Sequence, residues 1–142
     1  GRCVNKKRID YYKSLVEQCN MGLENRIGVQ VGTLSGGQRQ ALALVIANMT
    51  NVDLLILDEH IAALDPKSSE IVMKLTNDLV LKNNITTMMV THNLRFAAEY
   101  GNRLVMMHSG NAILDIRDEE KKNTKVEDLL KIFDEISIET GN

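Results

Sequence analysis

Two short apolar runs lie on either side of an amphipathic segment in the middle of the chain. Residues 54–57 are continuously apolar, and residues 85–90 form a second run rich in β-branched side chains. Runs of this length predict parallel strands buried on both faces. Between them, Asp65 and Pro66 have the residue types of a helix N-cap and first position. The segment that follows has apolar residues at helical spacing, at Ile71, Val72, Leu75 and Leu79.

The middle of the chain is therefore predicted to be a strand–helix–strand unit. The strands, at about 53–58 and 85–91, should be parallel and adjacent. A helix over 66–82 should join them in a right-handed crossover. Alternating strands and helices of this kind are typical of an α/β fold with a parallel sheet.

The segments before this unit are predicted to be mostly helical. Apolar residues at helical spacing favour an amphipathic helix over about 8–20, ended by Gly22, and residues 25–33 have the composition of a loop. Residues 38–49 are nearly all apolar or Ala, which predicts a buried helix.

The C-terminal third predicts a hairpin between helices. Asn93 is placed to cap a short helix that stops before Gly101. The turn residues 109–111 separate two apolar runs, 104–107 and 112–116, a pattern that predicts a β-hairpin. Residues 117–123 are charged and predict a loop, and Thr124 with Glu127 has capping-box spacing before a final amphipathic helix.

Composition narrows the possible functions. The 142 residues suit one domain or part of one, and 17 basic against 19 acidic residues give a formal charge of 17 − 19 = −2. This balance offers no electrostatic reason to expect nucleic acid as a partner. No apolar run approaches the roughly 20 residues of a membrane span, and the polar N-terminus does not read as a signal peptide. Two cysteines, Cys3 and Cys19, do not make a disulfide framework, so we expect a cytosolic protein.

The first candidate for chemistry is the sequence Leu34-Ser35-Gly36-Gly37-Gln38, directly before the predicted buried helix. Two glycines allow close backbone approach to a ligand, and the following helix start favours an anion such as phosphate. The Ser35 hydroxyl has two possible roles. It could cap the helix or bond a phosphate oxygen, and for an isolated Ser-Gly-Gly the cap is the better interpretation.

Acidic residues and a histidine follow the two predicted strands. Asp58 and Glu59 end the first strand, at the edge where open α/β sheets place ligands. Asp58 could hold Mg²⁺, and Glu59 could act as a general base on an attacking water. His92 follows the second strand and could stabilise charge on a phosphate. Taken alone, each has a plainer interpretation as a surface or structural residue, and N-capping fully accounts for Asp65.

The order of these features resembles the ATP-binding cassette (ABC) ATPase family. Leu-Ser-Gly-Gly-Gln matches the signature motif of the family, and the apolar run that ends in Asp58-Glu59 matches its Walker B strand. Ala63-Leu64-Asp65 matches the D-loop, and His92 matches the switch histidine. The resemblance covers about residues 8–116, and we expect it to extend over the whole chain. It implies a partial P-loop NTPase fold, with 1–34 belonging to a helical subdomain, 35–116 to the catalytic α/β core, and 117–142 to a charged loop and helix.

The resemblance also implies a role for each site residue. Ser35, Gly36, Gly37 and Gln38 would contact ATP held by a second ATPase protomer, with Ser35, Gly37 and Gln38 at its γ-phosphate. Asp58 would serve Mg²⁺, and Glu59 would be the catalytic base. His92 would contact the γ-phosphate, and Asp65 would communicate across a homodimer. The family usually has Pro after the base, where this chain has His60, and we expect no role for His60.

One required part of such a site does not occur in the sequence. No Gly-x-x-x-x-Gly-Lys-Ser/Thr loop, which holds the nucleotide phosphates, is found in the 142 residues. The chain also begins without Met. We therefore expect a C-terminal portion of an ABC ATPase, inactive alone. Residues 58–70, with the segments 91–93 and 101–115, resemble the ATPase subunits of bacterial importers, and the remaining expectations follow from that resemblance. The ATPase would lie at the inner face of the membrane on a transmembrane permease, served indirectly by a substrate-binding protein.

Two alternatives stay open at this point. The chain could belong to a non-transporting ABC ATPase of DNA repair or translation, although the short helix before the signature disfavours the repair type. It could also be a non-catalytic partner that binds without turnover. The presence of Glu59 and His92 argues against that alternative, and the missing loop argues for it.

Overall fold

The computed structural model describes residues 35–49 and 51–139, together with Ser14 and Glu17. The predicted end of the first helix at Gly22, the loop at 25–33, Leu34 and both cysteines lie outside these residues, as does nearly all of the helix over 8–20. The chain forms two compact units, residues 1–90 and 91–142, and residues of the expected core 35–116 occur in both. Each unit is described by itself.

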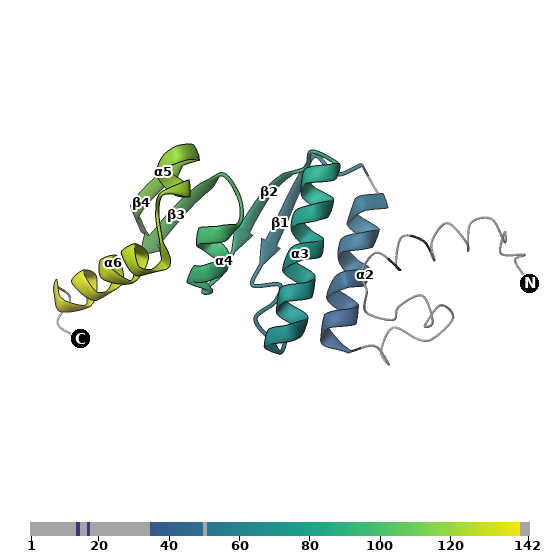
Figure 1. Ribbon diagram of the computed structural model, residues 1–142, viewed down its shortest axis with the longest axis horizontal. Coiled ribbons are helices and arrows are strands. Elements are labelled where there is room, and N and C mark those ends of the chain that lie inside the picture. Colours follow the sequence, from purple (N-terminus) through teal and green to yellow (C-terminus); the bar gives the residue numbers. More distant parts are fainter. Residues whose placement is uncertain (1–13, 15–16, 18–34, 50, 140–142) are drawn as a thin grey trace, which may run out of the picture. The chain divides into compact units, whose positions relative to one another are not determined.

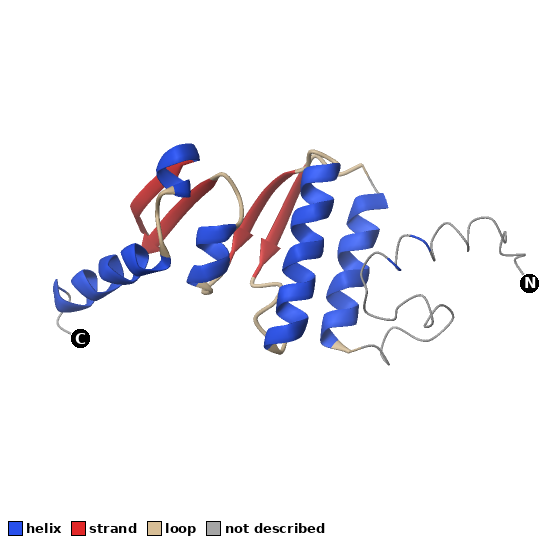
Figure 2. Ribbon diagram, in the orientation of Figure 1, coloured by secondary structure: helices blue, strands red, loops and turns tan. Residues whose placement is uncertain are grey.

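In the first unit, the described residues from 35 onward form two helices and two strands, arranged as the apolar pattern predicts (Figure 1). The elements are α2 (Gly36–Met49), β1 (Leu54–Asp58), α3 (Pro66–Lys82) and β2 (Thr86–Val90). β1 and β2 are parallel and adjacent, in a register that runs from Leu54 beside Thr86 to Asp58 beside Val90. Figure 2 shows α3 beside the strands and α2 beside α3. The parallel α/β unit is thereby confirmed.

The core of the first unit forms around one face of α3. Val72, Met73, Leu75 and Leu79 are buried on this helix, and Ala41 and Leu44 are buried on α2. Burial of a Val, Leu or Met side chain stabilises a fold by about 1.5–3 kcal/mol. Two polar residues, Ser69 and Thr76, share this buried face of α3, and the apolar pattern alone did not predict them.

The opposite face of the β1–β2 sheet differs from expectation. The exposed fractions are 52 % for Leu54, 56 % for Ile56, 53 % for Met88 and 47 % for Val90. The prediction that these strands are buried on both faces is therefore wrong for the structure as it stands. The reason is that, within the described residues, the sheet has two strands and helices on one side.

The second unit is a helix–hairpin–helix arrangement with its own core. Its elements are α4 (Leu94–Glu99), β3 (Arg103–His108), β4 (Asn111–Arg117), α5 (Asp118–Lys122) and α6 (Val126–Glu139). β3 and β4 are antiparallel and joined by Ser109-Gly110, which have φ values of 47° and 79°. Two consecutive positive φ angles give a turn that matches strand twist. The core cluster consists of Leu104, Met106, Ile116 and Leu129.

Two details of the second unit differ from the sequence-based predictions. Residues 118–122 of the expected charged loop form α5, whose acidic first turn and basic last turn favour a helix. Thr124 does not start a capping box with Glu127, because its hydroxyl donates to the Glu120 carbonyl at the end of α5. The Lys125 N–H instead donates to the Asp128 carboxylate at the start of α6.

Candidate functional site

The start of α2 is fixed by a reciprocal pair of hydrogen bonds. The Gln38 N–H donates to Ser35 Oγ at 3.2 Å, and the Ser35 N–H donates to Gln38 Oε1 at 3.1 Å. This is a capping box, which satisfies two N–H groups that have no partner within the helix. The capping interpretation of Ser35 is confirmed, and the two side chains are held together at the positive end of the helix dipole.

The end of β1 presents the two candidate carboxylates. Asp58 is the last strand residue and lies beside Val90 in the register, and both Asp58 and Glu59 are exposed. Glu59 has a φ of 47°, which is uncommon for a residue with a side chain. Its N–H donates to the Val90 carbonyl at 2.8 Å, and its carbonyl accepts the Ala62 N–H at 3.0 Å. Glu59 is therefore turned out of the strand direction and held by its backbone on both sides.

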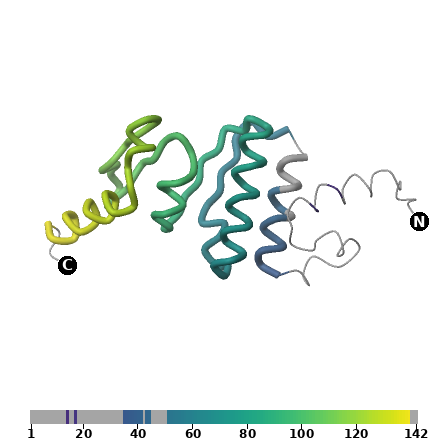
Figure 3. Tube along the Cα trace, in the orientation of Figure 1, coloured from purple at the N-terminus to yellow at the C-terminus, as the bar shows by residue number. Residues whose placement is uncertain are grey.

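The loop after Glu59 returns the chain to α3, as the Cα trace shows (Figure 3). His60 is buried, and its Nε2 lies 3.3 Å from Thr76 Oγ1 on α3. Burial lowers the pKa of His60, because a charged imidazolium is disfavoured away from water. At the other end of the loop, Asp65 caps α3 by accepting from the Ser68 N–H at 3.1 Å and the Ser68 hydroxyl at 3.0 Å.

The same loop approaches the start of α2. A Cβ atom placed on Gly36 would lie 3.3 Å from Cδ2 of Leu64, which is tighter than ordinary van der Waals contact. Absence of a side chain at Gly36 thus permits close packing between the Ser35–Gln38 segment and the loop 59–65. The structure brings these two predicted site segments together within the first unit.

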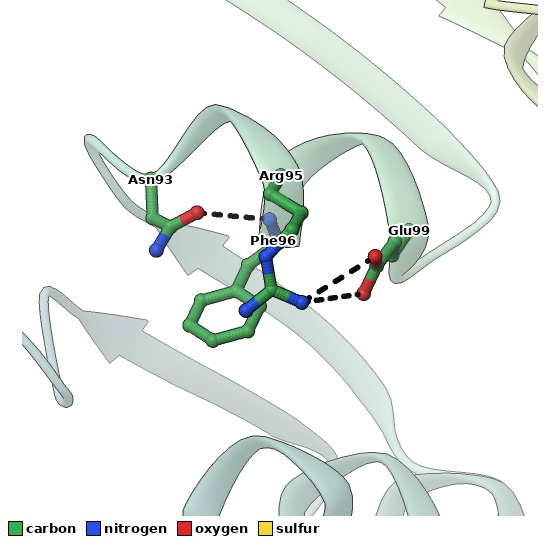
Figure 4. Close-up of polar contacts among 4 residues, drawn as sticks. All are labelled: Asn93, Arg95, Phe96 and Glu99. Atoms are coloured by element: carbon green, nitrogen blue, oxygen red, sulfur yellow. Dashed lines mark hydrogen bonds and ion pairs between the residues drawn. The ribbon is translucent and has the colours of Figure 1, made fainter. Parts of the chain in front are cut away.

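His92 belongs to the second unit, directly before the cap of α4. It is exposed, and the following residue, Asn93, accepts the Phe96 N–H at 3.1 Å (Figure 4). Asn93 also donates its own N–H to Thr91 Oγ1 at 3.0 Å. Arg95 lies over the Phe96 ring at 4.6 Å and pairs with Glu99 at 3.4 Å. The predicted cap at Asn93 is confirmed, and it fixes the backbone next to His92.

The donor set at the end of β1 fits Mg²⁺. This ion is commonly bound by one or two carboxylates together with waters and substrate phosphates, and the exposed Asp58 carboxylate can supply such a ligand. Within residues 35–49 and 51–139 there is no group of three or more His, Cys, Asp or Glu side chains placed to hold a metal by themselves. The arrangement suits an ion that arrives with a phosphate ligand.

Sequence reasoning missed the contact between His60 and Thr76. One signal was present, because Thr76 lies four residues after Val72 and three before Leu79, on the buried stripe of α3. A polar side chain on such a stripe requires a hydrogen-bond partner. The Thr76 hydroxyl finds such a partner within α3, at the Val72 carbonyl four residues before it. Its second contact could not be identified from spacing, since His60 lies sixteen residues away and outside regular structure.

Comparisons with known proteins agree with this geometry. The family model for ABC transporters matches residues 5–62. The tyrosine transport ATP-binding protein of Clostridioides difficile (strain R20291) is 44 % identical over 139 residues, which cover 94 % of this chain and 55 % of that protein. A methionine import ATP-binding protein of Oenococcus oeni (strain ATCC BAA-331 / PSU-1) is 35 % identical over 113 residues, covering 80 % of this chain and 31 % of that protein.

The fold also matches a solved structure. An ATP-binding cassette of an ABC transporter in its ADP conformation superimposes with a TM-score of 0.72 at 24 % identity, covering 99 % of this chain and 52 % of that chain. This likeness shows the P-loop NTPase fold of such cassettes. The chain spans about half the length of the first of these relatives and of this structure.

Proposed function

Because this chain belongs to the ATP-binding proteins of ABC transporters, we propose that it carries one part of an ATPase site that drives solute transport. The observation that carries the proposal is the position of Glu59. Glu59 directly follows the parallel strand β1 and leaves the strand direction at a positive φ. Its N–H donates to the Val90 carbonyl, which holds the backbone in this position. A carboxylate fixed just beyond a strand end is well placed to orient and deprotonate a water.

The other residues have complementary roles in this proposal. Asp58 holds Mg²⁺, and His92 donates to the γ-phosphate, stabilising charge that develops during transfer. Ser35, Gly36, Gly37 and Gln38 contact the ATP of a second protomer, which makes the working unit a homodimer. Asp65, fixed by its cap on α3, carries the contact between the two protomers.

We propose that the phosphate-binding loop of such a site comes from a segment beyond these 142 residues. Support comes from the sequence, which contains no such loop, and from the sheet face formed by Leu54, Ile56, Met88 and Val90. A contiguous exposed apolar face of this kind marks a surface that another segment covers. We propose that the covering segment is the phosphate-binding part of the ATPase, and that without it the chain binds ATP poorly and does not hydrolyse it.

We also propose the transport context. The relatives named above are ATP-binding proteins for tyrosine transport and methionine import, so an amino acid or a similar small solute is the proposed cargo. The ATPase would act at the inner face of the membrane through a permease, with a substrate-binding protein outside. None of the helices in the described ranges is long and apolar enough to cross a membrane.

The central test is Glu59→Gln in the complete ATPase that contains this chain. The change keeps the shape of the side chain and removes the base, so ATP binding should persist while hydrolysis falls by roughly 10²–10⁴-fold. Asp53→Asn is the matched control, because Asp53 is an exposed acid at the opposite end of the same strand. Nucleotide binding and phosphate release are measured for both variants. Hydrolysis near the normal rate in Glu59→Gln would refute the assignment of the base.

A further inference from the structure

Glu59 adopts a backbone conformation that requires support from its surroundings. A positive φ at a residue with a side chain is strained and persists only where neighbouring structure enforces it. The hydrogen bonds to Val90 and from Ala62 fix the peptide groups on both sides of Glu59. These two bonds do not fix the next residue, His60. The position of His60 determines how the turn lies against the rest of the unit.

His60 supplies that contact through a bond whose direction can be assigned. The Thr76 hydroxyl donates its single hydrogen to the Val72 carbonyl at 2.7 Å. Thr76 Oγ1 must therefore accept from His60, so the imidazole carries its proton on Nε2. This tautomer ties the residue after Glu59 to the middle of α3.

An imidazole at position 60 is less favourable for packing alone than an apolar side chain of similar volume. His60 Nδ1 is buried and has no hydrogen-bond partner among the described residues. A buried nitrogen without a partner lowers stability, whereas an apolar side chain of similar volume would not. What the imidazole adds over such a side chain is the directional bond to Thr76.

The far end of the same loop is anchored to the same helix. Asp65 caps the first turn of α3, and the Ser69 hydroxyl lies 3.5 Å from the carbonyls of Ile61 and Leu64. With this end fixed, the bond between His60 and Thr76 anchors the beginning of the loop to α3, directly after Glu59.

We propose that His60 is a positioning residue for Glu59, acting through its Nε2–H bond to Thr76 to hold the turn that directs the catalytic carboxylate. This inference rests on the proposed role of Glu59 as the base. His60 takes no part in proton transfer in this proposal. Loss of its bond should alter the rate of hydrolysis much more than the binding of ATP.

The first test removes the bond in the complete ATPase. His60→Leu fills the same buried space with an apolar side chain that cannot form the bond. In this variant kcat should fall by roughly ten- to a hundredfold, as expected for a misplaced catalytic group, and KM should change by less than about twofold. His60→Gln places an amide donor near the position of Nε2 and should recover most of kcat. Thr76→Val removes the acceptor and should resemble His60→Leu, and combining the two should add little.

Two further measurements separate positioning from a general effect on packing. Met73→Leu, a conservative change at another buried position of α3, should leave kcat unchanged. In a Glu59→Gln background, His60→Leu should slow the residual hydrolysis by less than about twofold, because the group that it positions is already absent. An equal slowing in both backgrounds would overturn the inference.

The outcomes for the two proposals can be distinguished. If Glu59→Gln hydrolyses ATP normally, the proposed function of Glu59 fails whatever His60 does. If Glu59→Gln is inactive but His60→Leu has normal kcat, only the inference about His60 fails. Thermal unfolding of each variant confirms that the rates compare folded protein.

Discussion

The parallel pair β1–β2 and the hairpin β3–β4 are both two-stranded, yet they achieve burial in different ways. In the hairpin, Leu104, Met106 and Ile116 point to one face and pack with Leu129 of α6, and Leu94, Ala97, Ala98, Leu114 and Ile132 complete this cluster. In the parallel pair, the face with Leu54 and Ile56 is more than half exposed. The outer face of the hairpin combines Val105 and Met107, which are 43 % and 58 % exposed, with the Arg103–Asp115 ion pair. The outer face of the parallel pair instead presents mainly apolar side chains to solvent.

This difference indicates which unit depends on another segment for its stability. A hairpin whose inner face packs on its own flanking helices can form a core locally. Parallel strands in α/β proteins are covered by helices on both faces, and among the described residues of the first unit helices cover only one face. The second unit should thus be self-sufficient, and the first should gain stability when another segment covers the sheet.

The largest expected effect is in the core of the second unit. Leu129→Ala, at a residue with 0 % exposure, should lower the free energy of unfolding by about 2–5 kcal/mol, because it leaves a cavity. Leu130→Ala is the control, since the adjacent residue on α6 is 47 % exposed and should change stability by less than about 0.5 kcal/mol. Urea unfolding of both variants measures the difference. Equal losses would show that α6 packs by another face.

A second substitution tests the exposed face of the first unit. Ile56→Thr keeps a β-branched residue, so in the isolated chain the free energy of unfolding should change by less than about 0.5 kcal/mol. In the complete ATPase the same change should lower it by about 1.5–3 kcal/mol, if a segment covers this face. The comparison requires thermal or denaturant unfolding of both forms. A small effect in both would mean that the face stays exposed.

A third prediction concerns the buried amine of the second unit. Lys121 Nζ donates to the carbonyls of Ala98 and Tyr100, each at 2.9 Å, at the end of α4. Lys121→Met keeps most of the apolar chain but removes both donors, so the free energy of unfolding should fall by about 1–3 kcal/mol. Lys122→Met should change it little, because its pairing with Glu119 is exposed. Denaturant unfolding monitored by circular dichroism distinguishes the two variants.

The smallest expected effect is a decrease in the free energy of unfolding at acidic pH. Hydrogen bonds from Arg103, at 2.9 and 2.7 Å, lower the pKa of Asp115 below its ordinary value. Below that ordinary value, near 4, the unfolded chain binds more protons than the folded chain, so this contribution to stability is lost as pH falls. Asp115→Asn should remove it. Unfolding midpoints between about pH 3 and 7, at low and high salt, test this, since salt screens an exposed pair.

Much of the fold was predictable because its signals are local. Asp65 and Asn93 cap α3 and α4 as predicted, and the Ser109-Gly110 turn joins the predicted hairpin. The helix α5 was missed although its acidic first turn and basic last turn favour a helix. The contact of Lys121 with the end of α4, more than twenty positions away, could not be inferred from the charge pattern of residues 117–123.

The candidate site was predictable to a different extent. The sequence order of Ser35, Asp58, Glu59 and His92 identified the chemistry through a family resemblance, and their roles remain proposals. The positive φ of Glu59 and the contact of His60 with Thr76 could not be predicted, because both depend on how the loop 59–65 folds back on α3. The apolar pattern also predicted that both faces of the β1–β2 sheet are buried, whereas one face is exposed among the described residues.

The capping box at the start of α2 has a consequence for the kind of ion that this end of the helix accepts. Ser35 Oγ and Gln38 Oε1, the two side-chain oxygens that a cation would seek, already accept backbone N–H groups. Each of these bonds uses one of the two lone pairs of its oxygen, whereas an anion meets the positive end of the helix dipole directly. The residues that begin the helix thereby favour a negatively charged ligand there over a cation.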